Sequence, residues 1–237
     1  MNFSLENLLV LDIETVRSHS QYEEMPERLQ AQWDRKAGFL RKEEEETAKD
    51  IYEDKGGIYA EFGKVVAISV GFFTYSGPDL SLRVKAIFGD DESVILNEFN
   101  EVVGKFDSKK LILCAHNGKE FDFPYLCRRM LVNNIKLPQV LDTSGKKPWE
   151  VNHLDTMEMW KFGDRKNFTS LELLATLFDI PSSKDGIDGS QVSGVYYNDH
   201  EVERIAKYCS KDVVVTAQLL LKLNQQAAIE QENIHII

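Results

Sequence analysis

The chain has 237 residues, 43% of them hydrophobic, which is enough for one large domain, and it has no apolar run long enough for a transmembrane helix. Three cysteines without CxxC spacing exclude a zinc-binding pattern, and the acids interrupting MNFSLENLLVLDIET argue against a signal peptide, so we expect a reducing, cytoplasmic setting. The formal net charge of −11, taken alone, argues against a broad phosphate-binding surface but does not exclude an enzyme that binds nucleic acid locally and supplies cations at its active site.

Alternation of apolar and polar residues and turn signals predict the elements in chain order. Residues 8–13 form a first strand, and residues 65–75 and 82–88 form an antiparallel hairpin around the turn signal SGPD at 76–79. The remaining elements are a helix at 91–106, a buried strand at 111–115, and helices at 121–134, 169–178 and 199–224. This order predicts an α/β fold, a mixed sheet flanked by helices, in a single domain spanning 1–237.

Residues 17–62 separate the first strand from the second. The segment contains EEEE at 43–46 and few strand signals, so it is expected to be a charged, mostly helical, solvated insertion. The alternative is a mobile lid over the site. The sequence does not decide its role.

Asp12 and Glu14 form the first acidic group. Side chains alternate along a strand, so both carboxylates project from the same face, near the carboxyl end of the first strand. That end of a central strand is a common place for a site in an α/β sheet. A divalent cation would offset the repulsion between the two groups, whereas the alternative is a strand that simply ends in exposed acids.

Two further groups have polar residues at helix-compatible spacing. Asn117 follows the buried strand, and Asp122 lies in the first turn of the next helix, where it could instead be an ordinary cap. Tyr208 and Asp212 are four residues apart and share one helix face. Alone, this pair is also explained as the polar boundary of an amphipathic helix.

Together the three groups resemble the three motifs of the DEDD superfamily of 3′–5′ exonucleases, which have a ribonuclease H-like fold. The matching residues are DIET with Asp12 and Glu14, N-x-x-x-F-D with Asn117, Phe121 and Asp122, and Y-x-x-x-D with Tyr208 and Asp212. The histidine branch of the superfamily has His where this chain has Lys207, so Tyr208 indicates the tyrosine branch, which includes proofreading domains of DNA polymerases.

Three other stretches resemble a stand-alone bacterial family of predicted exonucleases related to the family B polymerase exonuclease domain. They are residues 64–72, 153–160 and 185–192, and that family carries a charged insertion like 17–62. The stretch DGIDGSQV at 185–192 is interpreted as a structural loop with a tight glycine turn. Its further role stays open.

The resemblance implies a two-metal-ion hydrolysis of phosphodiester bonds with Mg²⁺ or Mn²⁺, because hard oxygen ligands prefer these ions. The implied metal ligands are Asp12, Glu14, Asp122 and Asp212, with Asp12 bridging the two ions. Tyr208 would orient the attacking water, and the implied substrate contacts are Thr15, Asn117 and Phe121. Phe121 is equally well explained by core packing.

The expected substrate is the 3′ end of single-stranded DNA. An RNA-trimming exonuclease of the same fold, or a non-catalytic module that binds nucleic acid or a polymerase, are the alternatives. A DNA polymerase or repair factor is the expected protein partner, and no membrane is expected. Basic residues that could contact the strand are Arg128, Arg129, Lys146, Lys147, Lys161, Arg165 and Lys166.

Overall fold

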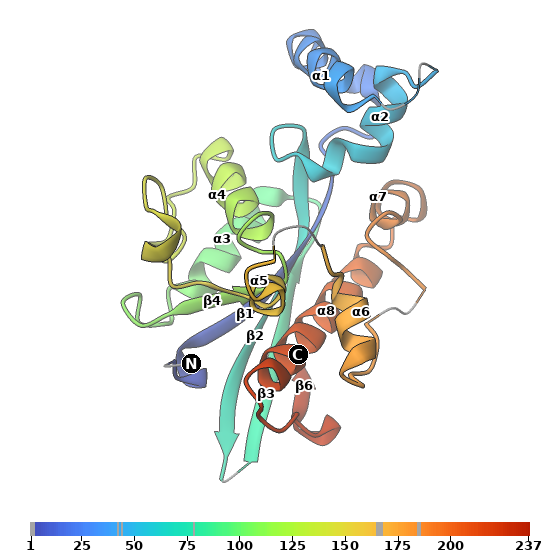
Figure 1. The fold of residues 1–237 in the computed structure, drawn as a ribbon. Coiled ribbons are helices and arrows are strands. Elements are labelled where there is room, and N and C mark those ends of the chain that lie inside the picture. Colours follow the sequence, from blue (N-terminus) through green and yellow to red (C-terminus); the bar gives the residue numbers. More distant parts are fainter. Residues whose placement is uncertain (1–2, 42, 44, 78, 165–167, 184–185) are drawn as a thin grey trace.

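The computed structural model describes residues 3–41, 43, 45–77, 79–164, 168–183 and 186–237. Within these residues, one mixed sheet of six strands has the order β5-β4-β1-β2-β3-β6 (Figure 1). The strands are β1 Leu8–Arg17, β2 Gly63–Ser76, β3 Asp79–Phe88, β4 Ile112–Ala115, β5 Leu154–Asp155 and β6 Ile234–Ile236. β2 is antiparallel to both β1 and β3, whereas β4 is parallel to β1.

Helices cover both faces of this sheet. The helices of the described residues are α1 Glu27–Leu40, α2 Ala48–Lys55, α3 Glu92–Val103, α4 Asp122–Val132, α5 Thr156–Lys161, α6 Leu171–Leu177, α7 Val192–Gly194 and α8 Val202–Leu223, and α1 and α2 among them lie beyond the end of the sheet. The mixed sheet flanked by helices is therefore confirmed. None of these helices, in the part of the chain that the structure describes, has the length and apolar character needed to cross a membrane.

The sequence of β1 decides which helices cover which face. Leu9 and Leu11 pack with residues of α3 and α4, whereas Leu8 and Val10 pack against α8. This division follows the two-residue period of a strand. By the same period, Asp12 and Glu14 continue the row that faces α8, so the fold directs both carboxylates toward the helix that carries Tyr208 and Asp212.

Several predicted boundaries need correction. β1 continues to Arg17 instead of ending at residue 13, because it stays paired with β2 beyond the end of its pairing with β4. α6 begins after Ser170, whose hydroxyl accepts the Leu173 N–H, so the predicted start of this helix at residue 169 is wrong. Pro78 of the predicted turn lies outside the described residues. The short strands β5 and β6 were not predicted.

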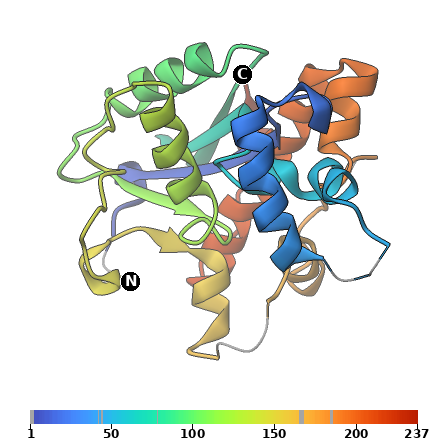
Figure 2. The same cartoon turned by 90° about the horizontal axis from the view of Figure 1, so that it is seen from above.

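The segment between β1 and β2 contains α1 and α2, as the charge pattern indicated. These helices pack on each other around a small apolar cluster of their own that includes Trp33, Ala37, Ile51 and Tyr52. They project from the end of β1 and β2, apart from the helices that cover the sheet (Figures 1 and 2). Residue pairing between Arg17 and Gly63 closes the base of this segment.

Candidate metal centre

Asp12 and Glu14 lie inside β1, on the row that faces α8. Their ladder partners on β2 are Ser69 and Ala67, and immediately after Glu14 the register shifts by one residue. Such a bulge inserts an extra residue in one strand and changes the direction of the following side chains. Glu14 is buried, with 8% of its surface exposed. The pair is therefore held by a paired strand, not by a loose strand end.

Asp122 reaches this strand because β4 is short. The pairing of β4 with β1 extends only to Val10, so the N–H of Ile13 has no strand partner on that side. That N–H donates instead to Asp122 Oδ1, at 3.2 Å. Asp122 is the first residue of α4 and is 3% exposed. The hydrogen bond thus fixes the carboxylate at the edge of the sheet, close to Asp12.

α8 supplies the third side of the site. Tyr208 and Asp212 lie one turn apart on this helix, and a side-chain hydrogen bond joins them. Asp212 is buried and Tyr208 is half-buried. The packing of Val213 and Ala217 against Leu8 and Val10 fixes the helix on the sheet. The five residues predicted to carry chemistry are therefore gathered from three elements.

The acids of this site are buried close to one another, and their carboxyl pKa values are raised. Burial, followed by the charges of Asp212, Glu14 and Asp122, raises the pKa of Asp12 well above its ordinary value. Burial and the neighbouring Asp212 and Asp122 charges raise the pKa of Glu14 likewise. Burial raises the pKa of Asp122 to about 7, although the backbone hydrogen bonds act in the opposite direction. Charges this close require protons or cations to offset them.

The donor set fits a hard divalent cation. Asp12 Oδ2 is buried and has no hydrogen-bond partner among the described residues, and such an oxygen costs free energy unless a proton or an ion occupies it. The ligand atoms of Asp12, Glu14 and Cys209 lie within 4.8 Å of one another. Asp122 and Asp212 are outside that tight group, although their charges act on both acids. Oxygen ligands of this type suit Mg²⁺ or Mn²⁺.

Cys209, on α8, is a further neighbour of the two acids of β1. Its Sγ donates to the main-chain oxygen of Asp12, at 3.3 Å. Burial, and then the Asp12 and Glu14 charges, raise the pKa of this thiol well above its ordinary value. A neutral thiol is a poor ligand for Mg²⁺. Cys209 therefore supports the strand and is not expected to bind the metal.

Thr15 makes a contact that its position in the motif did not indicate. Its hydroxyl donates to the Gly57 carbonyl oxygen at 2.8 Å, and the Tyr125 hydroxyl donates to the same oxygen at 2.9 Å. A Cβ on Gly63 would lie 2.2 Å from the Tyr125 hydroxyl, so only glycine fits there. Thr15 thus fastens the last residues of the insertion to β1, directly after Glu14, and Tyr125 fastens them to α4.

Asn117 and Phe121 lie in the loop that leads into α4. Asn117 has a positive φ of 63°, and its N–H donates to Asp155 Oδ1 at 3.0 Å. The side-chain oxygen of Asn117 is buried and has no partner among the described residues. The Phe121 ring lies 5.4 Å from the Tyr125 ring, centroid to centroid. Asp155, which fixes this loop, was missed because the sequence gives no sign of the short strand β5.

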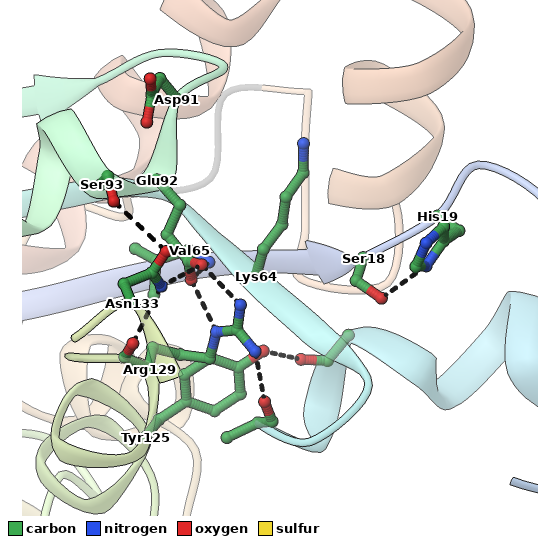
Figure 3. Close-up of polar contacts among 12 residues, drawn as sticks. Ser18, His19, Lys64, Val65, Asp91, Glu92, Ser93, Tyr125, Arg129 and Asn133 are labelled. Atoms are coloured by element: carbon green, nitrogen blue, oxygen red, sulfur yellow. Dashed lines mark hydrogen bonds and ion pairs between the residues drawn. The ribbon is translucent and has the colours of Figure 1, made fainter. Parts of the chain in front are cut away.

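Arg129 is among the basic residues that could contact the strand, but the structure places it in a buried ion pair instead. Its guanidinium forms two hydrogen bonds to Glu92, of 2.8 and 2.6 Å, and a third to the Ala60 carbonyl oxygen (Figure 3). Both side chains are nearly buried, at 11% and 8% exposed. Glu92 also accepts the Val65 N–H at 2.8 Å. This buried pair joins α3, α4 and the start of β2, so Arg129 is structural. Arg165 and Lys166 lie outside the described residues.

The raised pKa values predict a pH-dependent stability for the metal-free protein. Between the ordinary carboxyl pKa of 3.8 and about 7 for Asp122, the folded state binds more protons than the unfolded chain. Stability therefore falls as pH rises through this window. A cation binds the deprotonated carboxylates, so Mn²⁺ is expected to raise Tm more at pH 8 than at pH 5, by about 5–10 °C at pH 8 with free Mn²⁺ at about 100 times its Kd.

Differential scanning fluorimetry in EDTA and in Mn²⁺ measures this. Asp122→Asn serves as the control, since it should flatten the pH dependence seen in EDTA. Equal Mn²⁺ shifts at pH 5 and pH 8 would contradict a carboxylate metal centre.

Comparison with known proteins adds a family and a fold. Residues 58–235 match a family model described as a predicted 3′–5′ exonuclease related to the exonuclease domain of PolB. DNA polymerase 1 of Pyrococcus abyssi is 26% identical over 121 residues, which are 46% of this chain and 15% of that protein. The DNA polymerase of Pyrococcus glycovorans is 25% identical over 141 residues, 54% of this chain and 18% of the polymerase.

The family B DNA polymerase of Pyrobaculum calidifontis is a similar solved structure. Its TM-score is 0.54 at 18% sequence identity, and the match covers 91% of this chain and 24% of that chain. This likeness shows the fold, and the ribonuclease H-like α/β class predicted from the sequence is confirmed. The chain spans less than a quarter of the length of each of these polymerases.

Proposed function

The chain belongs to the family of predicted 3′–5′ exonucleases related to the exonuclease domain of PolB, and from this premise we propose that it hydrolyses the 3′-terminal phosphodiester bonds of single-stranded DNA. In this proposal residues 1–237 act as one exonuclease domain. The observation that carries it is the meeting of four buried or half-buried carboxylates, from β1, α4 and α8, around an oxygen of Asp12 that has no partner among the described residues.

Each acid has a role in the proposed mechanism. Asp12, Glu14, Asp122 and Asp212 would hold two divalent cations, Mg²⁺ or Mn²⁺. When bound, such ions would supply a nucleophilic hydroxide and charge stabilisation at the phosphoryl oxygens. The Ile13 N–H keeps Asp122 turned toward β1. The bulge after Glu14 and the contacts of Thr15 keep the strand from shifting. In this proposal the protein therefore holds the closely spaced carboxylates in position before the ions bind.

Tyr208 acts by orientation. Burial and the neighbouring Asp212, Glu14 and Asp12 charges raise the pKa of its phenol far above its ordinary value. The hydroxyl therefore keeps its proton at all working pH values, and it can position a water molecule but cannot act as a base. Asn117 and Phe121 stay candidates for contact with the terminal nucleotide, because both lie in the loop that precedes Asp122.

Two alternatives are retained. RNA trimming uses the same chemistry and differs only in acceptance of the 2′-OH. A binding module without catalysis would not need four acids close enough to raise one another's pKa. The polymerase relatives make a DNA polymerase or repair factor the proposed protein partner.

The test uses matched 5′-labelled DNA and RNA oligonucleotides. With Mn²⁺ or Mg²⁺ the DNA strand should shorten stepwise from its 3′ end, and EDTA should stop the reaction. Faster loss of the RNA would favour the trimming alternative. Intact DNA and RNA after incubation with folded wild-type protein in Mn²⁺ would overturn the proposed activity.

A further inference from the structure

Three large aromatic side chains are exposed in the part of the chain between α4 and α6. Trp149 is 75% exposed, Phe162 is 89% exposed and Phe168 is 69% exposed. An exposed tryptophan is unusual in a protein with a well-packed core, because burying its ring is strongly favourable. Lys146 and Lys147 are exposed beside it, and Lys147 Nζ lies 5.3 Å from the centre of the Trp149 ring. Aromatic rings with adjacent cations are typical of single-strand binding surfaces.

A cavity of about 580 Å³ opens beside Trp149. The residues that line it include Lys119, Phe123, Lys146, Trp149, His153 and Glu158. Its volume is in the range of cavities that bind small molecules. The cavity lies between α4, α5 and the segment that leads from α4 to β5.

The chemistry of this cavity suits an uncharged ring. The His153 side chain packs against Phe123, with ring centroids 4.9 Å apart, and burial lowers the pKa of His153 to about 4. The imidazole is thus neutral at physiological pH. Lys119 and Glu158 form an ion pair, with 2.7 Å between Lys119 Nζ and Glu158 Oε2, so their charges offset each other. Apart from Lys146, these walls offer little to a phosphate, whereas a nucleobase could stack on the exposed Trp149 ring with its phosphate near Lys146.

The same loop walls both this cavity and the metal centre. The N–H groups of Asn117 and Lys119 both donate to Asp155, at 3.0 and 3.1 Å, which fixes the loop before Asp122. A Cβ on Gly118 would lie 2.3 Å from that of Ala115, so the loop packs directly on β4. Lys119 and Phe123 face the cavity, while Asp122 between them points to Ile13.

We propose that the Trp149 cavity binds a base of the single-stranded substrate, upstream of the nucleotide being removed. The proposal rests on the proposed nuclease function for the direction of the strand. The proposed binding of a base does not depend on the nuclease function. Stacking of one base is expected to strengthen binding of strands long enough to reach Trp149 and to leave shorter strands without this contact.

The experiment compares oligothymidylates of 4 and 12 nucleotides. Trp149→Ala should weaken binding of the fluorescein-labelled 12-mer by about fivefold or more, measured by anisotropy in EDTA, since stacking of one base contributes about 1–3 kcal/mol. In Mg²⁺, the ratio of kcat/KM for the 12-mer to that for the 4-mer should fall by a similar factor. Trp149→Phe, which keeps a ring, should retain most of the affinity. Phe39→Ala, at a ring 91% exposed on α1, is the matched control.

The outcomes separate the two proposals. Equal 12-mer affinities for wild type and Trp149→Ala, a loss no larger than that of Phe39→Ala, or no 12-mer binding by wild type would each overturn the base-binding site. A wild-type protein that binds the 12-mer through Trp149 but cleaves neither DNA nor RNA would support the site and overturn the nuclease activity.

Discussion

Asp12→Asn is expected to lower the rate of 3′-terminal hydrolysis by about 10³-fold or more and, at the same time, to raise the Tm of the metal-free protein. The carboxylate would contribute several kcal/mol of transition-state stabilisation through the cations, and about 4 kcal/mol corresponds to a factor of 10³. In the absence of metal the substitution removes one charge from a cluster in which Asp212, Glu14 and Asp122 raise the pKa of Asp12. Rates on a labelled strand in Mn²⁺ and melting curves in EDTA measure the two effects.

Asp54→Asn, at an exposed acid of α2, is the control and should change neither quantity. An unchanged rate for Asp12→Asn would show that Asp12 is not a metal ligand. A lower Tm in EDTA would show instead that the acidic pair stabilises the fold. The interpretation that repulsion among these acids destabilises the metal-free protein would then be wrong.

Arg129→Ala is expected to have the largest effect on stability. Among the described residues, it would leave the Glu92 carboxylate, 8% exposed, with the Val65 N–H and the Asn133 side-chain amide as its hydrogen-bond donors, each at 2.8 Å. Breaking a buried ion pair from one side costs about 3–5 kcal/mol, which lowers Tm by roughly 6–20 °C in a chain of this size. Urea unfolding followed by circular dichroism measures the free energy.

The double variant Arg129→Met with Glu92→Gln tests the cause. Removal of both charges leaves no unpaired ion, so the double variant should recover a large part of the lost stability. A double variant as unstable as Arg129→Ala would show that shape, and not the unpaired charge, causes the loss. Lys85→Ala, which removes a half-exposed ion pair with Glu98, should cost about 1 kcal/mol or less.

The resemblance to the three exonuclease motifs predicted which acids meet, and the structure shows a physical reason for it. Because side chains alternate along β1, Asp12 and Glu14 lie on the same face of the sheet. Because Tyr208 and Asp212 are four residues apart, they lie on the same face of α8. The apolar rows beside them pack on the same side of the sheet, so the polar residues have to meet. Their roles as ligands and the water-positioning role of Tyr208 stay predictions.

What could not be predicted depends on partners distant in the chain. Thr15 donates to Gly57, and Arg129 pairs with Glu92, but neither partner is marked by a local pattern. β5 has two residues and β6 has three, and such strands are too short for alternation to be recognised. The contact of Cys209 with Asp12 likewise requires knowing the position of α8 over β1.

The pairing of Arg17 with Gly63 has a consequence for how the chain can change in length. The two ends of the insertion leave and re-enter the sheet as neighbours, so the insertion is an enlarged hairpin loop. Doubling the length of such a loop costs only about 0.6 kcal/mol in closure entropy. The part of the insertion that carries α1 and α2 can therefore be shortened without displacing Asp12 and Glu14. Residues 56–62 cannot, because they contain the Gly57 and Ala60 carbonyl groups that Thr15, Tyr125 and Arg129 require.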